Sequence, residues 1–288
     1  MDTRLFRLLP DILKSLRLFG LILLLFPSLS LAQADAAPKT ATTENQTESH
    51  MARIQRRGNL RICIWPDYYA ISYRNPRTGN LEGMDILMAQ ALAEELGVTP
   101  HFVDSSFKTL ADDLRTDRCD ISMHGIAITP ARREVLDFSH PTLHSGIAAV
   151  TLRSHPTIRE WGDIDQPGVV VAVQAGTYMV DVARRDLAAA QIVVVQSTEA
   201  REQEVTSGRA DVFLTDYPYS RRLLTRADWA KLLLPPQPWS PLPYAYAIAK
   251  GDPAWLATVN DFVARSKADG RLLQAARSHG LDAIVVLE

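Results

Sequence analysis

The sequence predicts an α/β fold in two lobes, each built on a mostly parallel sheet flanked by helices. Short apolar runs alternate with amphipathic helical patterns, which is typical of parallel sheets covered on both faces. This alternation occurs over residues 59–128 and begins again over residues 169–216. Two extended apolar runs, 145–156 and 242–253, bracket the second unit. They predict two strands that cross between the lobes as a hinge.

The first 32 residues have the pattern of an export signal. A basic segment precedes "LFGLILLLF", an apolar run shorter than the ~20 residues that span a bilayer. Small residues, Ser30 and Ala32, precede the expected cleavage point near Ala32. An uncleaved membrane anchor is the alternative. Residues 33–52 are polar and aperiodic, so we predict a flexible linker there.

The first unit is predicted to contain three strands and two helices. The strands are 59–65, 98–104 and 119–128, the helices are 85–96 and 105–118, and a turn-rich segment spans 66–83. Ile86, Ala89, Ala93 and Leu96 recur at helical spacing in the first helix, and Gly97 is a natural stop.

The second unit repeats this order without repeating the sequence. Its strands are 169–174, 191–196 and 210–216, and its helices are 175–187 and 197–208, the latter capped by Ser197 or Thr198. Two further helices, 253–270 and 271–280, are expected to pack back on the first lobe. The predicted boundaries are 53–149 for lobe 1, 150–243 for lobe 2, and 244–288 for the return to lobe 1.

Composition excludes several classes of function. The net charge is −2, with both signs mixed along the chain, and no basic run is interleaved with aromatic residues, so nucleic acid is not an expected partner. The seven histidines have no metal-ligand spacing, and no cofactor or metal is expected. Cys63 and Cys119 could pair in an exported protein. Because parallel neighbouring strands would offset them, we predict two separate thiols.

Two charged residues stand at strand ends that would face a cleft between the lobes. Arg132 follows Thr129 and Pro130, an N-cap and first residue typical of a helix start, and its planar fork suits a carboxylate. Asp216 ends a strand in the second unit and could accept an ammonium group. A surface ion pair for Arg132 and a helix N-cap for Asp216 are the alternatives.

Other candidates lie in the same predicted cleft. Thr177, in "QAGTY", offers a hydroxyl at a helix start after a glycine that permits close approach. Trp65 and Tyr68 could form an aromatic wall for a ligand. His124, near the end of the third strand, could bond a ligand or act as an acid, although a structural role is the alternative.

The chain resembles the bacterial extracellular solute-binding proteins of family 3, which serve polar amino-acid ABC transporters. The resemblance spans roughly residues 58–280 and rests on "CDISMHGIAITPARREVLDFSHP", "VAVQAGTY" and "GRADVFLTD". It implies a type II periplasmic-binding-protein fold and a periplasmic location. It also implies an amino acid or related carboxylate as ligand, a permease as partner, and a monomer.

The resemblance also implies roles for individual residues. Arg132 matches the arginine that binds the ligand carboxylate, and Asp216 matches the aspartate that binds its amino group. Ala127 stands where the family usually has a hydroxyl, so its backbone amide, or that of Gly125, would serve as donor. Tyr68 matches the aromatic cover of the ligand. The family's G-T-T turn becomes Gly176, Thr177 and Tyr178.

One branch of this family is an enzyme, periplasmic cyclohexadienyl dehydratase, and "ISYRNPRTG" and "MHGIAIT" resemble that branch. In it, a glutamate three residues after the strand-end aspartate acts as general acid, whereas this chain has Tyr219. Tyrosine, with a reference pKa of about 10, is a poor proton donor near neutral pH. We therefore expect a binding protein. A dehydratase that turns over prephenate or arogenate, or a ligand sensor, is the alternative.

Overall fold

The computed structural model describes residues 48–288, and these form one compact unit. The predicted export signal and most of the predicted linker lie outside the described residues. Within 48–288, no helix is both long and apolar enough to cross a membrane. The same residues contain no cluster of three or more side chains suited to hold a metal ion.

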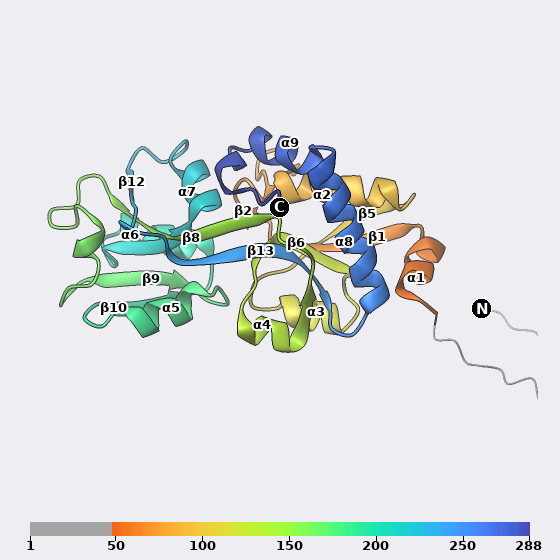
Figure 1. Cartoon of the computed structure of the whole chain (residues 1–288). Coiled ribbons are helices and arrows are strands. Elements are labelled where there is room, and N and C mark those ends of the chain that lie inside the picture. Colours follow the sequence, from red (N-terminus) through yellow and green to blue (C-terminus); the bar gives the residue numbers. More distant parts are fainter. Residues whose placement is uncertain (1–47) are drawn as a thin grey trace, which may run out of the picture. The chain divides into compact units, whose positions relative to one another are not determined.

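One large sheet organises the fold (Figure 1). Its strands run in the order β10 (Gln191–Val195), β9 (Val170–Gln174), β11 (Val212–Asp216), β8 (Leu143–Leu152), β13 (Trp239–Ala249), β6 (Ile121–Ala127), β1 (Asn59–Ile64) and β5 (Thr99–Asp104). Two short strands pair outside this order, β12 (Ala230–Leu233) with β8 and β7 (Leu136–Phe138) with β13.

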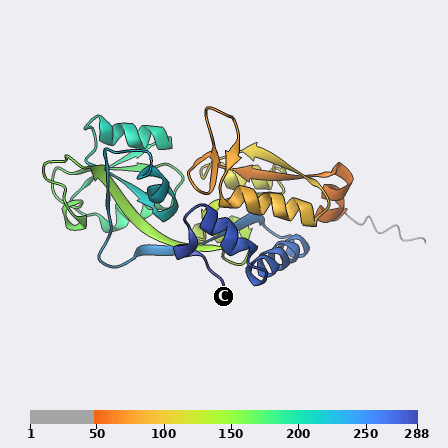
Figure 2. The ribbon, with the colours of Figure 1, turned by 90° about the horizontal axis from the view of Figure 1, so that it is seen from above.

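The sheet has two parallel halves joined by antiparallel strands. β1 is parallel to both β5 and β6, and β9 is parallel to both β10 and β11. The long strands β8 and β13 are antiparallel to each other and connect the halves, as Figures 1 and 2 show. The predicted two-lobed α/β fold with two crossing strands is confirmed.

Helices cover both halves. They are α1 (His50–Arg57), α2 (Met84–Glu95), α3 (Leu110–Arg115), α4 (Pro130–Val135), α5 (Met179–Asp186), α6 (Thr198–Thr206), α7 (Tyr217–Leu223), α8 (Pro253–Ala268) and α9 (Arg271–Ser278). Short 3-10 turns occur at η1 (Trp161–Asp163) and η2 (Asp282–Ile284). α9 packs on α2 and α8, and Trp255 of α8 donates its indole N–H to the Asp120 carbonyl beside β6.

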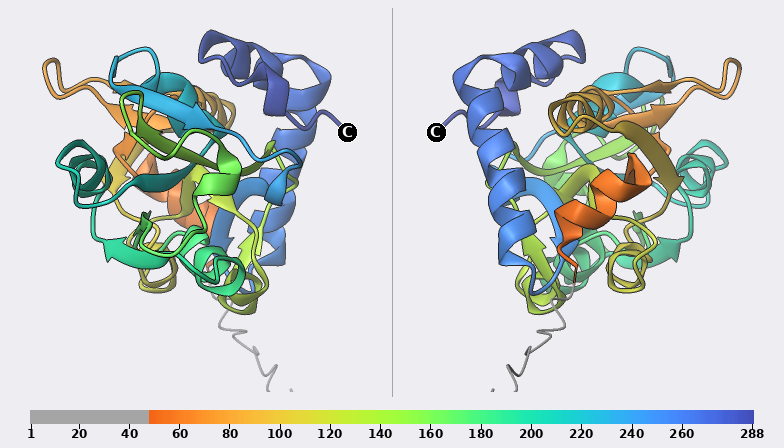
Figure 3. Two further views of the ribbon diagram at one scale, coloured as in Figure 1. Left: turned by 90° about the vertical axis from the view of Figure 1, so that its left-hand side faces the viewer. Right: turned by 90° about the vertical axis from the view of Figure 1, so that its right-hand side faces the viewer.

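The structure corrects the end of the predicted linker. α1 begins at His50, with Ser49 as its N-cap, so residues 50–52 are helical. The His50 ring stacks on Trp255 of α8 at 5.3 Å between centroids and bonds Asp120 at 3.1 Å. α1 thus lies beside α8, as the right-hand view of Figure 3 shows. The polar composition of this segment predicts a linker. The residues that hold the helix in place, Trp255 and Asp120, lie far away in the sequence, so local composition does not reveal them.

Two other predictions need revision in detail. The turn-rich segment 66–83 contains a small antiparallel sheet of β2 (Asp67–Tyr68), β3 (Ser72–Arg74) and β4 (Leu81–Glu82). The helix predicted over 105–118 is shorter, since only α3 is helical there.

The prediction of two separate thiols is wrong, because Cys63 and Cys119 form a disulfide with their Cα atoms 5.6 Å apart. β1 and β6 are indeed neighbours, and Cys63 pairs in register with Ser122. However, Cys119 lies before β6 begins, where the chain is not held in the strand's straight path. The offset expected between straight parallel strands therefore does not apply to it.

Candidate ligand-binding site

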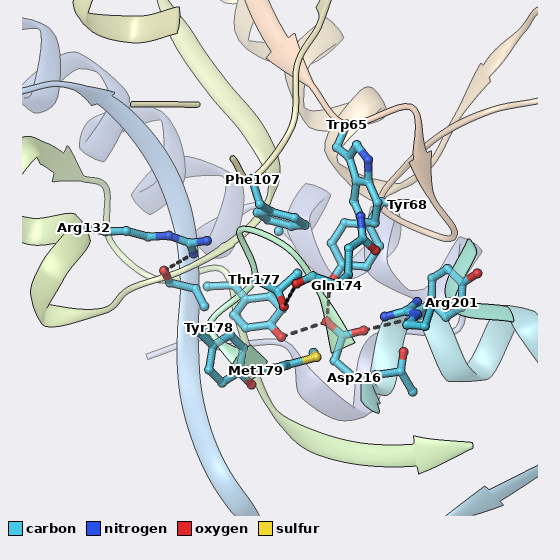
Figure 4. Close-up of a pocket in the computed structure, with 15 residues that line it drawn as sticks. Trp65, Tyr68, Phe107, Arg132, Gln174, Thr177, Tyr178, Met179, Arg201 and Asp216 are labelled. Carbon is cyan, nitrogen blue, oxygen red and sulfur yellow. Dashed lines mark hydrogen bonds between the residues drawn. The ribbon is translucent and has the colours of Figure 1, made fainter. Parts of the chain in front are cut away.

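A pocket lies between the two halves of the sheet (Figure 4). Residues from both halves line it: Trp65, Tyr68, Phe107, Gly125, Ala127, Arg132, Gln174, Thr177, Tyr178, Met179, Arg201, Thr215, Asp216, Tyr219 and Tyr244. Its free volume is about 30 Å³, which is room for about two water molecules. The lining side chains therefore fill most of the cleft.

Arg132 reaches the pocket from α4, whose start is built as the sequence predicts. Thr129 caps the helix by accepting the Arg132 N–H at 3.2 Å, and Pro130 is the first helical residue. The guanidinium donates to the Ala127 carbonyl at 2.8 Å and, across the cleft, to the Gly176 carbonyl at 3.1 Å. Burial lowers its pKa to about 10, so it stays charged at neutral pH.

Asp216 is both the last residue of β11 and the N-cap of α7. One carboxylate oxygen accepts the Tyr219 N–H at 3.2 Å, as the N-cap alternative requires. The other oxygen faces the pocket, where it accepts hydroxyl hydrogen bonds from Tyr68 and, at 2.8 Å, from Tyr244. Burial raises the pKa of Asp216, while these hydrogen bonds favour the carboxylate. Asp216 can therefore cap α7 with one carboxylate oxygen and present the other to the pocket as an acceptor.

The turn after β9 brings the two halves into close contact. Gly176 has φ +78°, and a Cβ there would lie 2.7 Å from the Lys108 backbone nitrogen. Only glycine fits such an approach in this conformation. Thr177 lines the pocket, and its hydroxyl donates to the Gln174 carbonyl at 2.8 Å. A donor role of Thr177 toward a ligand stays a prediction.

Aromatic rings form one wall of the pocket. Trp65 and Tyr68 lie with ring centroids 5.2 Å apart, and Phe107 packs edge-on against both. The Arg132 guanidinium lies 5.5 Å from the centroid of Phe107. Tyr178 also lines the pocket, and its hydroxyl is buried without a hydrogen-bond partner among residues 48–288. The predicted aromatic side of the cleft is present, with Phe107 in addition.

The backbone donor predicted at Gly125 must be corrected. Its N–H donates to the buried Asp85 carboxylate at 2.8 Å, so this amide already has a partner. Gly125 instead makes room for the ring of Tyr68, since a Cβ at its φ of +63° would lie 2.8 Å from the ring. Ala127 lines the pocket, and its carbonyl accepts from Arg132.

His124 does not line the pocket, contrary to the prediction. Its ring lies edge-on behind Phe107, at 5.1 Å between centroids, and is fully buried. Nδ1 lies 3.2 Å from the Ser122 hydroxyl and 3.4 Å from the Cys63 carbonyl. Burial lowers the pKa of His124 to about 3, so the ring is neutral. The backbone is irregular here, since Gly125 has a φ of +63° and the pairing of β6 with β13 shifts register between Ser122 and Ile126. Position along the strand therefore did not predict where the His124 ring points.

Sequence reasoning did not identify several of the lining residues, namely Phe107, Gln174, Met179, Arg201, Thr215 and Tyr244. Arg201 lies on α6, within a helix that reads as an ordinary polar surface helix. Tyr244 lies on the crossing strand β13. A buried arginine cannot be distinguished from an exposed one by composition, so no sequence signal separates Arg201 from its neighbours.

A family model described as bacterial extracellular solute-binding proteins, family 3, matches residues 60–281. The chain belongs to this family. Cyclohexadienyl dehydratase of Pseudomonas aeruginosa is 33% identical over 236 residues, which are 82% of this chain and 87% of that protein. L-cystine-binding protein TcyJ of Escherichia coli is 25% identical, over 78% of this chain and 84% of that protein.

Solved structures of family members share the fold, which is that of type II periplasmic binding proteins. The ancestral amino acid-binding protein AncCDT-1, a precursor of cyclohexadienyl dehydratase, is 33% identical with a TM-score of 0.74. The match covers 80% of this chain and 99% of that one. A mutant of ArgBP from T. maritima is 26% identical with a TM-score of 0.72, covering 80% and 98% respectively.

Proposed function

We propose that the protein captures a small amino acid or related carboxylate in the periplasm and delivers it to the permease of an ABC importer. The observation that most supports this function is that Arg132 and Asp216 line the same pocket from opposite halves of the fold. A guanidinium and a carboxylate placed this way suit the two ends of a zwitterion. Membership of a solute-binding family supports the same function.

The bonding of the pocket suggests how a ligand enters. The Asp216 carboxylate accepts hydrogen bonds from two tyrosine hydroxyls and one backbone N–H. The Arg132 guanidinium donates to two backbone carbonyls. A ligand ammonium would replace a tyrosine hydroxyl at Asp216. A ligand carboxylate would replace the Gly176 carbonyl at Arg132. The ligand then links the same two halves that these bonds link now.

Binding is tested by thermal unfolding of the mature chain with a panel of amino acids, dicarboxylates and prephenate. A ligand that binds only the folded state, at 100 times its dissociation constant, adds about 2.7 kcal/mol. We expect a shifted midpoint with an amino acid that is recovered chemically intact. A panel with no shift would contradict the proposed function.

Arg132→Ala tests the role of the arginine. We expect it to cost about 2–5 kcal/mol of binding free energy, because a buried charge pair loses one partner. Calorimetric titration with the ligand from the panel measures this loss. Arg133→Ala is the matched control, since Arg133 is exposed on the same helix. Equal affinity of Arg132→Ala and the parent would refute the proposed clamp.

The second candidate is a dehydratase, favoured by the similarity to cyclohexadienyl dehydratase. The surroundings of Tyr219 do not favour a dehydratase reaction. Its hydroxyl donates to Glu202, and burial raises its pKa far above the usual value, so it does not release a proton near neutral pH. His124, neutral and behind Phe107, supplies no acid either. Consumption of prephenate or arogenate by the purified protein would favour the enzyme.

A further inference from the structure

Arg201 is a buried cation in the same pocket, and among residues 48–288 no carboxylate makes an ion pair or hydrogen bond with it, although Asp216 lies in the same pocket. Its residue is 3% exposed. The guanidinium donates to the Leu214 carbonyl at 3.0 Å and lies 4.7 Å and 4.5 Å from the ring centroids of Phe213 and Tyr219. Rings and a carbonyl orient the charge but do not neutralise it, and an unpaired buried charge is costly.

Unused polar atoms accompany this charge. In the described part of the chain, Nε of Arg201 and Oγ1 of Thr215 are buried without a hydrogen-bond partner. Both residues line the pocket. Thr215 directly follows Leu214, whose carbonyl holds Arg201. Since buried polar groups nearly always have partners, these atoms indicate a ligand group that supplies acceptors.

The charges of the lining residues indicate which charge the ligand group near Arg201 carries. Arg132, Arg201 and Asp216 are the charged side chains among them, and Figure 4 shows Asp216 between the two arginines. A zwitterion with a neutral side chain would balance Arg132 and Asp216 and leave Arg201 unpaired. A ligand with a second carboxylate would balance all three.

We infer that the ligand is a small amino acid with an acidic side chain, whose side-chain carboxylate binds Arg201. This inference rests on the proposed function and adds the chemical class of the ligand. A basic amino acid would bring a third cation beside Arg201. The pocket therefore differs in charge preference from the structurally similar arginine-bound ArgBP of T. maritima.

The experiment compares acidic amino acids with their amides, L-glutamate with L-glutamine and L-aspartate with L-asparagine, by calorimetric titration. The parent protein is expected to bind one of the acids about tenfold to 100-fold tighter than its amide, the range for a hydrogen bond to a charged group. Arg201→Met is expected to abolish this preference, because Met keeps the apolar stem but carries no charge to bind the side-chain carboxylate.

Arg184→Met, an exposed arginine of α5 in the same half, is the control and should keep the preference. Arg201→Lys, which retains the charge, should keep part of it. Should Arg201→Met fail to fold, the comparison of acid and amide in the parent still decides. Equal or tighter binding of the amide, or tighter binding of arginine or lysine, overturns the acidic ligand but leaves the proposed function intact. No binding of any amino acid, dicarboxylate or prephenate overturns both.

Discussion

At the scale of single residues, burial decides which titratable groups are charged. Arg132 keeps its charge despite desolvation, whereas His124 loses it. Asp85 is a third case outside the pocket. It is 1% exposed and accepts the N–H of Gly125, which positions the backbone beneath Tyr68. Leu87 on α2 is 41% exposed and does not line the pocket.

Asp85 should make stability depend on pH. Burial raises its pKa from 3.8 to about 7, so the folded state binds more protons than the unfolded state between these values. The free energy of unfolding contributed by Asp85 therefore falls as pH rises from about 4 to 7, by about 4 kcal/mol. Asp85→Asn, which keeps an acceptor for Gly125, should flatten this part of the profile.

Urea unfolding at pH 4, 5.5 and 7 measures the effect, with the exposed Asp181→Asn as control. Parallel profiles for the parent and Asp85→Asn would show that Asp85 titrates normally.

At the scale of elements, the disulfide joins β1 to the segment that leads into β6. The bond closes a loop across β5 and α3, with a sequence separation of 56. Both sulfurs lie in a cluster of buried apolar residues that includes Leu110, Leu114 and Ile126. The first half of the sheet is thus held by a covalent bond as well as by packing, which suits an exported protein.

Removing the disulfide should lower stability strongly. The chain-entropy estimate for a loop of this length is about 4 kcal/mol. The double variant Cys63→Ala, Cys119→Ala should lose about this much free energy of unfolding in urea. Thiol titration of the unfolded parent without reductant checks the bond itself. Two reactive thiols there would contradict the disulfide.

At the scale of the whole described unit, contacts across the cleft hold the halves together. Tyr68 bonds Asp216, Arg132 bonds the Gly176 carbonyl, and the rings of Tyr69 and Tyr219 stack at 5.0 Å. The two crossing strands β8 and β13 are the parts of the sheet that connect the halves. Closing and opening of the cleft would therefore bend these strands and break the contacts across it.

Gly176→Ala should hinder closure. The added Cβ would lie 2.7 Å from the Lys108 nitrogen, at a φ of +78° that disfavours alanine. We expect about tenfold weaker ligand binding and a larger radius of gyration in X-ray scattering with ligand present. Gly162→Ala is the control, since nothing lies within 4 Å of its Cβ position. Unchanged affinity and size would show that the turn accommodates the added Cβ and that closure does not require glycine at position 176.

The sequence by itself determined most of the secondary structure around the sheet and predicted the two charged residues, Arg132 and Asp216, that line the pocket. Periodicity depends on which face of a strand or helix is buried, and caps such as Thr129 and Ser197 act within a few residues. The local pattern places Asp216 at the end of one strand and Arg132 shortly after another. The family resemblance was needed to favour a ligand role over a surface ion pair for Arg132 and a helix N-cap for Asp216.

Only the tertiary structure decided the features that depend on distant residues. The disulfide, the helix at His50, the burial of His124 behind Phe107 and the unpaired charge of Arg201 all arise from segments brought together by folding. Burial, partner and pKa are properties of a side chain's surroundings in space. A local pattern of residue types specifies the element that presents a side chain but not what lies against it.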